Sequence, residues 1–462
     1  MDISPQKFLS IKEVLAYSLG LFGFQLIVGF LNSYQAEFYF TAMNANLAVT
    51  GVLILIVKIV SAAFDPVVGN MIEKRGKLKP FILVSVLPLF IMTVVIFIKV
   101  PLAGVGLYAY IFFTFLLFSM AATLGDVPSC AIASSVTPNP TERTNLVSLS
   151  NTLKAIGLSA SAAVIPVVCL IVPGGSAVVT QNGAPDTPIS TLEYTVSAIA
   201  IAVVGCVFFL FIYFFNKERV PYAAEKMSFR DMLGVLKGNK PFMLVIISCF
   251  LGFGRQIQTG IAVQAANSIM GGQNYLLIIG ITGGIGGVIS MSLTPLLIKK
   301  FGEKRTYIGL SLYGFVMSLV TFLVGYENIA VMLVLLFFAG FQFGVVNILP
   351  VVMATDSVDY YEYKTGKRAE GTIYAALSLT VKVTLAMGTA LGLALVNFSG
   401  YDIALGGLQS EGTKTMVYFA YAAAPGIFSL LSVFPIIKYD LVGKKKLEIA
   451  AELQARRGAE NP

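Results

Sequence analysis

The residues of this chain that could do chemistry are ionisable side chains inside stretches that are otherwise apolar. Lys58 lies midway along one such stretch, and Asp65 follows about two helical turns later on the same face of a helix. A charge that faces lipid costs about 2.5–3.5 kcal/mol at the centre of a span, so such charges face the interior and mark pathways for ions or solutes. Four further residues are placed in the same way, namely Asp126, Lys154, Arg255 and Lys382.

Helical spacing groups these charges with neutral polar side chains. Residues three or four positions apart share one face of a helix, and three polar stripes arise in this way. We expect the stripes to converge on one polar cavity, in which opposite charges compensate one another. They consist of Lys58, Ser61 and Asp65; of Thr123, Asp126 and Cys130; and of Ser150, Lys154 and Ser161, with Asn151 at the edge of the third.

The composition is that of an integral membrane protein. Of the 462 residues, 56% are hydrophobic and 12% are charged, and the mean hydropathy is +0.82. The charged fraction of a globular domain is about a quarter, roughly twice as high. The net charge of +8 does not indicate a nucleic-acid partner, because the basic residues lie mostly in a few short loops, as the positive-inside rule predicts.

Residue types that are absent narrow the chemistry further. The chain has no histidine and no tryptophan, which removes His-based acid–base catalysis and His ligation of metals. No GxxxxGK loop for nucleotide is present. We therefore expect no enzyme, cofactor or metal site, and an ion or substrate gradient as the source of energy. The cysteines show no CxxC spacing and are interpreted as small buried apolar side chains; they are Cys130, Cys169, Cys206 and Cys249.

A window of about 20 residues predicts twelve membrane spans. Most Lys and Arg residues lie in alternate loops, on the side of the N-terminus, so both termini are expected in the cytoplasm of a multi-pass cell (inner) membrane protein. The spans are expected at 14–41, 48–72, 79–99, 105–131, 143–172, 191–216, 240–268, 274–298, 304–325, 329–354, 370–397 and 415–438.

A basic middle loop divides the spans into two groups of six. The step from Asp65-Pro66 into a basic loop has a weaker echo at Thr294-Pro295, as expected for duplicated halves with a substrate site at the membrane midplane between them. The expected domains are an N-terminal six-helix bundle (1–216), a cytoplasmic middle loop (217–239), a C-terminal six-helix bundle (240–440) and a cytoplasmic tail (441–462).

Three separated motifs have the order and spacing of one transporter family. The first runs from Lys58 to Gly69 and continues from Gly76 to Phe81; the second is Gly125-Asp126-Val127-Pro128. The third runs from Asp356 to Arg368 and leads to Lys382. Over essentially its whole length the chain resembles the glycoside-pentoside-hexuronide:cation symporters, the melibiose-permease-like branch of the major facilitator superfamily. The resemblance implies an all-α membrane protein with twelve transmembrane helices in two six-helix pseudo-repeats, the major-facilitator fold.

The resemblance also implies a cation site. In that family the acid at the position of Asp65 takes the coupling cation, and the span-11 lysine, here Lys382, lies near it. Sodium-using members have a second acid where this chain has Ser61 and an Asn where it has Phe64. Because sodium prefers several oxygens and a proton needs one responsive carboxylate, H+ is favoured over Na+ at Asp65. The predicted cation-coupling residues are Asp65, Lys58, Ser61, Thr123 and Lys382.

The expected sugar site departs from that of galactoside carriers. The acid of the span-4 Asp-x-Pro motif, Asp126, contacts sugar hydroxyls in the family. Galactoside carriers have an acid, an arginine and an aromatic residue where this chain has Gln25, Asn151 and Cys130, so a galactoside is not expected. The predicted substrate-binding residues are Gln25, Asp126, Asn151, Lys154, Arg255 and Tyr374, with a stacking face from Tyr374 or Tyr34.

Arg255 belongs to no motif of the family. Four cations and two acids are counted inside the spans, so a positive excess remains. One hypothesis is that the substrate is anionic, such as a uronide, and that Arg255 or Lys154 binds its carboxylate. The alternative is that Arg255 pairs with Asp126.

A cluster of charges follows span 10. Such a run is usually a solvated surface, whereas the resemblance favours an inner gate in which Asp356 and Asp359 pair with bases such as Arg143, Lys304 or Arg305 when the cavity opens outward. The predicted gate residues are Asp356, Asp359, Arg143 and Arg368.

The expected function is cation-coupled symport of a glycoside or related sugar by alternating access. Two alternatives stay open, a carrier of lysolipids or other amphiphiles and an uncoupled facilitator. The expected partners are a small-molecule substrate and membrane lipids, without nucleic acid, and the chain is expected to act as a monomer.

Overall fold

The computed structural model is all-helical. It describes residues 8–137, 140–162, 164–171, 190–219, 229–270, 275–366, 369–443, 445–449 and 451–453, and none of them forms a β-strand. The contacts divide the chain into two compact units. Unit 1 comprises Met1–Ala224, Thr259–Ile281 and Leu393–Val417; unit 2 comprises Glu225–Gln258, Thr282–Gly392 and Tyr418–Pro462.

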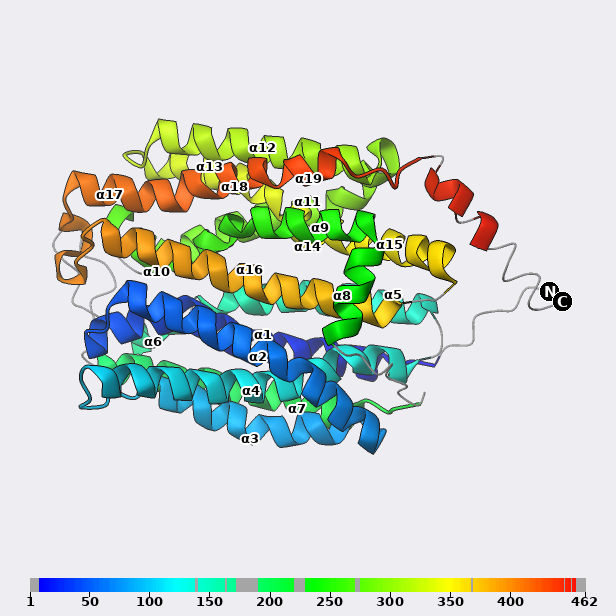
Figure 1. The fold of residues 1–462 in the computed structure, drawn as a ribbon. Coiled ribbons are helices and arrows are strands. Elements are labelled where there is room, and N and C mark those ends of the chain that lie inside the picture. Colours follow the sequence, from blue (N-terminus) through cyan, green and yellow to red (C-terminus); the bar gives the residue numbers. More distant parts are fainter. Residues whose placement is uncertain are drawn as a thin grey trace. The chain divides into compact units, whose positions relative to one another are not determined.

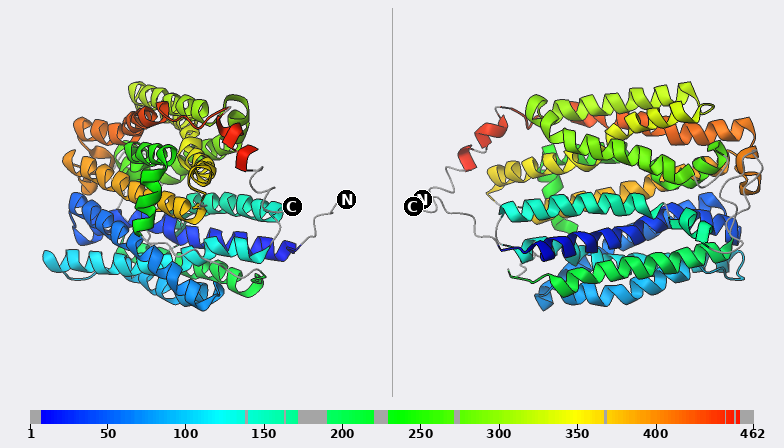
Figure 2. Two further views of the ribbon diagram at one scale, coloured as in Figure 1. Left: turned by 45° about the vertical axis from the view of Figure 1, so that its right-hand side comes forward. Right: turned by 180° about the vertical axis from the view of Figure 1, so that it is seen from behind.

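Unit 1 is built around a long N-terminal helix, α1. This helix packs against α5 and α7, while α4 packs against α2 and α3, and the ribbon views show these elements as long helices (Figures 1 and 2). The helices that lie wholly or largely in this unit are α1 (Ile11–Met43), α2 (Leu47–Arg75), α3 (Lys79–Ile96), α4 (Val105–Val136), α5 (Pro140–Ser161), α6 (Val164–Ile171), α7 (Thr191–Phe215), α10 (Ile257–Met270), η3 (Ile403–Leu408) and α17 (Glu411–Tyr418).

Small residues explain how closely α1 and α7 pack. A Cβ added at Gly23 of α1 would collide with the backbone carbonyl of Gly205 on α7, and a Cβ at Gly205 would in turn meet Gly23 and Ile27. Glycines allow such close helix crossings in a membrane, where no hydrophobic effect drives helices together. Packing and van der Waals contact therefore hold this pair.

Local sequence signals set the ends of α1. Ser10 and Glu13 form a capping box, in which each side chain accepts a hydrogen bond from the backbone N–H of the other. At the far end Asn44 adopts the left-handed conformation, and Asn46 then caps the N-terminus of α2. The two long helices are therefore joined by a short, well-defined turn.

Unit 2 contains more interrupted helices than unit 1. α12 packs against α18, and α9 packs against α15 and α19. Its elements are α8 (Phe229–Gly238), α9 (Lys240–Leu251), η1 (Phe253–Gln256), α11 (Tyr275–Phe301), α12 (Glu303–Val324), α13 (Ile329–Ala339), η2 (Gly340–Gln342), α14 (Phe343–Asn347), α15 (Leu349–Thr365), α16 (Glu370–Phe398), the π-helical turn η4 (Phe419–Ala423), α18 (Ala424–Leu431) and α19 (Val433–Ile437), with the first residues of α11 and the last of α16 in unit 1.

The predicted count of twelve spans is met in part. Within the described residues, nine helices are long and apolar enough to cross a membrane, or ten if the pair Lys240–Leu251 and Phe253–Met270, bent by 49°, is one span. The predicted span at 143–172 is divided into the relatively polar α5 and the short α6, and the one at 329–354 is broken after the 11-residue α13. The count of twelve and the domain boundaries stay predictions.

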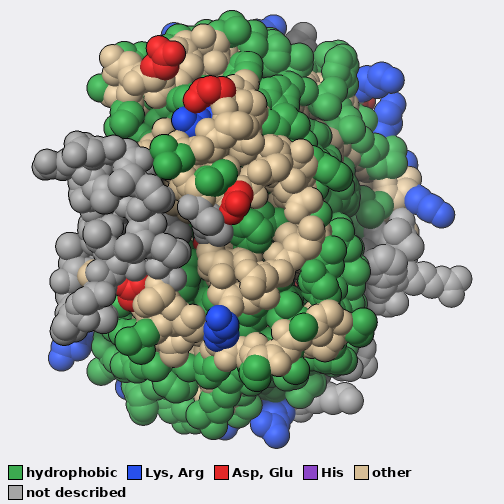
Figure 3. Space-filling model, turned by 90° about the vertical axis from the view of Figure 1, so that its left-hand side faces the viewer, with side chains coloured by type: hydrophobic (Ala, Val, Ile, Leu, Met, Phe, Trp, Pro, Cys, Tyr) green, Lys and Arg blue, Asp and Glu red, His purple; other side chains and the backbone are tan. Residues whose placement is uncertain are grey.

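The surface carries the apolar groups that a lipid environment requires. Large hydrophobic side chains are exposed on α3 (Val84 and Leu87) and on α12 (Leu319 and Leu323). In the view of Figure 3, most of the side-chain surface is hydrophobic and charged groups are sparse. Continuous apolar surface of this kind on helices is typical of membrane-spanning proteins.

Candidate functional site

The first cluster of unit 1 joins α2 and α4. The Thr123 hydroxyl donates to Oδ1 of Asp65 over 3.2 Å, and the Ser61 hydroxyl lies 3.5 Å from that of Thr123. Both hydroxyl groups are buried. Asp65 and Ser61 are four residues apart and therefore share one face of α2, so the stripe predicted from the sequence does meet that of α4. Lys58, on the same helix, lies with its ammonium 5.1 Å from the centre of the Phe115 ring.

The second cluster joins α4 and α5 through a thiol. Sγ of Cys130 lies 3.7 Å from Oδ1 of Asp126 and 3.7 Å from Nζ of Lys154. The interpretation of Cys130 as a buried apolar side chain is wrong, because this cysteine is exposed and contacts two charged groups. A thiol is both a weak donor and a weak acceptor, so it can bridge an acid and a base.

Two predicted sugar contacts in this unit are not joined to the clusters. Gln25 on α1 is half-buried and Asn151 on α5 is exposed. Within the described residues, neither side chain forms a hydrogen bond to Asp126 or Lys154. Their assignment to the substrate site stays a prediction.

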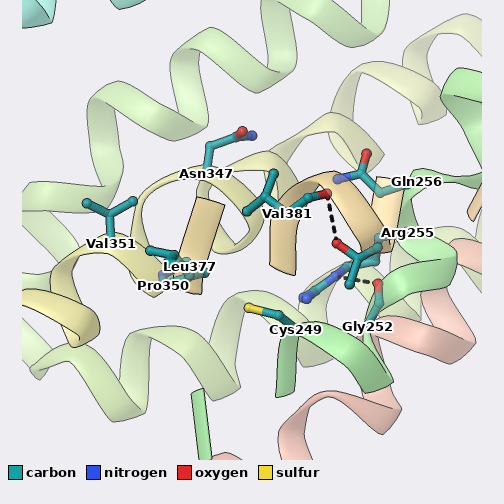
Figure 4. Close-up of a pocket in the computed structure, with 10 residues that line it drawn as sticks. Cys249, Gly252, Arg255, Gln256, Asn347, Pro350, Val351, Leu377 and Val381 are labelled. Atoms are coloured by element: carbon teal, nitrogen blue, oxygen red, sulfur yellow. Dashed lines mark hydrogen bonds between the residues drawn. The ribbon is translucent and has the colours of Figure 1, made fainter. Parts of the chain in front are cut away.

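Unit 2 has a pocket of about 190 Å³ that contains Arg255 (Figure 4). The Arg255 side chain is buried and bonds to neutral oxygens: its Nε donates to the carbonyl of Gly252 (3.2 Å), Nη1 to the Ser432 hydroxyl (3.3 Å) and Nη2 to the Tyr307 hydroxyl (3.3 Å). The pocket is lined by Cys249, Gly252, Arg255, Gln256, Asn347, Pro350, Val351, Leu377, Val381 and Thr384.

The break between α9 and η1 makes room for this guanidinium. Gly252 ends α9, and a Cβ at this position would collide with the side chain of Arg255. Within the described residues no carboxylate pairs with Arg255. The pocket therefore holds a buried positive charge whose partners are neutral, which favours an anionic ligand.

Two residues of α16 were also predicted to take part in substrate or cation binding. The Tyr374 hydroxyl lies 2.7 Å from that of Thr355 on α15, and Lys382 is half-buried. Neither residue is among those that line the pocket. Their roles in substrate and cation binding stay predictions.

The predicted inner gate contains a base that sequence reasoning missed. Nζ of Lys446, in the C-terminal tail, lies 2.8 Å from Asp356 and 2.7 Å from Glu303. Burial raises the pKa of Asp356 to about 6, although the hydrogen bond from Lys446 acts in the opposite direction. Lys304, one of the expected gate bases, instead donates to the carbonyl of Ile437 over 2.7 Å.

Three other gate residues remain to be placed. Asp359 is half-buried on α15. The side chains of Arg143 and Arg368 lie outside the described residues. The gate as a whole stays a prediction.

A buried acid in α1 was also missed. Glu37 is fully buried and accepts hydrogen bonds from Nε2 of Gln264 (2.6 Å) and Nδ2 of Asn267 (3.3 Å). It lies inside the span predicted at 14–41, so counting every charge within the spans would have found it. The sequence count of two buried acids is therefore too low.

Apolar helices that carry charged and polar clusters are typical of a membrane transporter. The family described as "MFS/sugar transport protein" matches residues 16–442, and the chain belongs to this family. The protein is therefore a major-facilitator transporter and not an enzyme.

Similar proteins cover the whole fold. The chain is 26% identical to the "Glucuronide carrier protein homolog" of Escherichia coli (strain K12), covering 97% of this chain and 96% of the relative. It is also 26% identical to the "Isoprimeverose transporter" of Lactiplantibacillus pentosus, covering 97% and 92%. A "Putative 2,3-dihydroxypropane-1-sulfonate exporter" of Salmonella typhimurium is 25% identical, with 97% of each chain covered.

Solved structures agree on the fold. The nucleoside transporter NupG matches with a TM-score of 0.64 at 14% identity, covering 93% of this chain and 100% of that one. A D-xylose-proton symporter matches with a TM-score of 0.61 at 12% identity, covering 94% and 98%. These likenesses show the major-facilitator fold.

Proposed function

We propose that this protein is a proton-coupled symporter for a glycoside with a carboxylate, such as a uronide, and that both of its termini are cytoplasmic. The observation that carries the proposal is the buried guanidinium of Arg255 in the pocket of unit 2, whose partners in the described chain are neutral. A carboxylate can take two parallel hydrogen bonds from such a group. The ligand would thus supply a negative charge that the described lining of the pocket does not provide.

The lining of the pocket supports a polyhydroxylated ligand. Gln256, Asn347 and Thr384 add amide and hydroxyl groups beside Arg255, and Leu377 and Val381 add apolar surface. Sugar sites combine such polar groups with an apolar wall. Two of the relatives carry names with anionic solutes, a glucuronide and a sulfonate, which agrees with a positive pocket.

The cluster of Asp126, Cys130 and Lys154 supports recognition of hydroxyl groups. A carboxylate accepts hydrogen bonds from sugar hydroxyls, and an ammonium donates to them. Cys130 already contacts both charged side chains, which holds the acid and the base near one another. We assign the sugar hydroxyls to Asp126 and Lys154.

Asp65 is the proposed coupling carboxylate. It accepts a hydrogen bond from Thr123, and Ser61 stands where a second acid would favour sodium. Protonation of one carboxylate needs no further oxygen ligands, whereas Na+ prefers several. Lys58 lies on the same face of α2 and is assigned to the same coupling site.

The test is transport by the purified full-length protein in proteoliposomes that enclose a pH-sensitive dye. Methyl β-glucuronide and methyl β-glucoside form a matched pair, because they differ only in a carboxylate against a hydroxymethyl group. Each is added outside with and without a sodium gradient. We expect inward proton movement with the glucuronide, at least tenfold less with the glucoside, and no effect of sodium.

Other outcomes would overturn parts of the proposal. Equal transport of both glycosides would reject the anionic substrate, and uptake without proton movement would favour a facilitator. Uptake that requires sodium would reject proton coupling at Asp65. Transport of a radiolabelled lysolipid with no glycoside uptake would decide for the amphiphile carrier.

A further inference from the structure

A buried polar cluster joins α1 to a helix from the other half of the sequence. Oε2 of Glu37 accepts from Gln264 on α10 over 2.6 Å, and its Oε1 accepts from Asn267 over 3.3 Å. Asn267 also lies 3.4 Å from the hydroxyl of Tyr401, just after α16. All four side chains are buried and belong to unit 1.

The chemistry of this cluster is unusual for a structural contact. Glu37 is fully buried, yet within the described residues no Lys or Arg pairs with it, and its donors are neutral amides. When the carboxylate separates from the amide, it is the only charged group that must find a new partner. Water can replace the amide as its hydrogen-bond donor when the site opens. Such a contact can break and form again repeatedly, unlike a buried ion pair.

The position of the cluster indicates what it holds closed. Glu37 lies near the end of α1 opposite the N-terminus, which is the external end if the termini are cytoplasmic. α10 lies in the second member of a helix pair, Lys240–Leu251 and Phe253–Met270, which bends by 49° at the break near Gly252. Thr259–Ile281 packs with unit 1, whereas Glu225–Gln258, which precedes it, belongs to unit 2. The hydrogen bonds therefore fasten the helix that follows this bend to α1.

We propose that Glu37, Gln264 and Asn267 form an outer latch, which keeps the external side shut and must part each time the transporter opens outward. The inference rests on the proposed transport cycle and its orientation, but not on the identity of the substrate. Glu37 is a positioning residue, since it acts on the opening of the cavity and not on the solute.

The test uses Cys130, which is exposed and lies between Asp126 and Lys154. In the full-length protein with the three buried cysteines replaced by Ala, a membrane-impermeant maleimide is added to the outside of right-side-out vesicles. We expect Glu37→Ala and Asn267→Ala each to speed the labelling of Cys130 at least fivefold. Glu193→Gln is the matched control, because Glu193 is a buried acid in the capping box of α7, where Gln can also cap.

The outcomes separate the latch from the substrate proposal. Labelling at the wild-type rate in both latch variants, with Cys130 fully reactive after denaturation, would overturn the latch. An equal acceleration in Glu193→Gln would also overturn it, because it would show general loosening. If Glu37→Ala fails to insert in the membrane, Asn267→Ala alone decides. The labelling needs no solute, so a failure of glucuronide transport would reject the substrate and leave the latch standing.

Discussion

The two clusters on α2, α4 and α5 of unit 1 and the pocket of unit 2 differ in how their charge is compensated. In unit 1, an acid and a base lie on either side of Cys130, and the Asp65 carboxylate accepts from a hydroxyl. In unit 2, the Arg255 guanidinium is surrounded by neutral oxygens in the described chain. A balanced cluster suits a neutral polyol or a proton, whereas a cation with only neutral partners among the described residues favours an anionic ligand. The two regions therefore differ in the chemistry that each could bind, with hydroxyl groups or a proton in unit 1 and an anion in unit 2.

The largest effect is expected from removing the coupling carboxylate. Asp65→Asn keeps the size of the side chain and can still accept from Thr123, but it cannot take up and release a proton. Accumulation against a gradient should fall to background, while exchange of labelled for unlabelled glucuronide across the membrane continues. Accumulation and exchange in the same proteoliposomes measure the two steps separately. Loss of both to the same degree would contradict a role in coupling.

Removing the Arg255 guanidinium should have the next largest effect. Hydrogen bonds to a charged group are worth about 1.5–3 kcal/mol, so Arg255→Gln should weaken glucuronide transport roughly 10- to 150-fold. Arg255→Lys keeps the charge and loses the planar fork, so its glucuronide transport should lie between that of the wild type and that of Arg255→Gln. The decisive quantity is the ratio of glucuronide to glucoside uptake. A proportional loss of both substrates would point to a purely structural arginine.

A smaller effect is expected from displacing Arg255 without removing it. The Cβ of Gly252→Ala would collide with the guanidinium, and overpacking of this kind costs about 1–3 kcal/mol. We expect roughly tenfold weaker glucuronide binding, measured as an increased KM. Gly309→Ala on α12 is the matched control in the same unit, since its Cβ would meet no atom within 4 Å. Equal behaviour of the two alanine variants would remove Gly252 from the site.

Loss of the Thr123 hydroxyl, which donates to Asp65, should have a smaller effect on transport. Thr123→Val removes one hydrogen bond, worth about 0.5–1.5 kcal/mol, and should shift the proton dependence of uptake by roughly two- to tenfold. Ser61→Ala is the control, because the Ser61 hydroxyl lies 3.5 Å from that of Thr123 and, within the described residues, does not bond to Asp65 itself. The measurement is the initial rate of uptake against external pH. A larger shift in Ser61→Ala would make Ser61 the direct partner of the carboxylate.

Much of this arrangement follows from local spacing. Ser61 and Asp65 lie on one face of α2, and Thr123 and Asp126 are three apart on α4, so helical periodicity alone predicted which side chains point the same way. The predicted count of twelve spans is met only in part by the described helices, because α5 is relatively polar and α13 is short.

Contacts between distant segments could not be predicted in this way. Glu37 and Gln264 are 227 residues apart, and Asp356 and Lys446 are 90 apart. No local pattern pairs such residues, and a single sequence does not show which helices are neighbours. The thiol contacts of Cys130 were hidden for the same reason, since residue type alone favours a buried cysteine.

The smallest effect is expected at the tail contact of unit 2. Burial raises the pKa of Asp356 to about 6, above the usual carboxyl value, so its folded form binds a proton more tightly than its unfolded form. The stability that this group contributes is therefore present at low pH and is lost as the pH rises through about 6. Melting temperatures in detergent at pH 5 and pH 7 should show this fall, and Asp356→Asn should flatten it by about 1–3 °C.

The control for this effect is a carboxyl group whose pKa is shifted in the opposite direction. At Asp440 burial alone would raise the pKa, but the hydrogen bond and the charge of Lys445, a backbone hydrogen bond and the charge of Lys240 together outweigh burial and hold the pKa below its usual value. Its stabilising effect is lost only at pH values below the usual carboxyl range, so Asp440→Asn should leave the change between pH 5 and pH 7 as it is in the wild type. If both variants flatten the pH profile equally, Asp356 is not the group that titrates, and the contact with Lys446 is only one of several surface ion pairs.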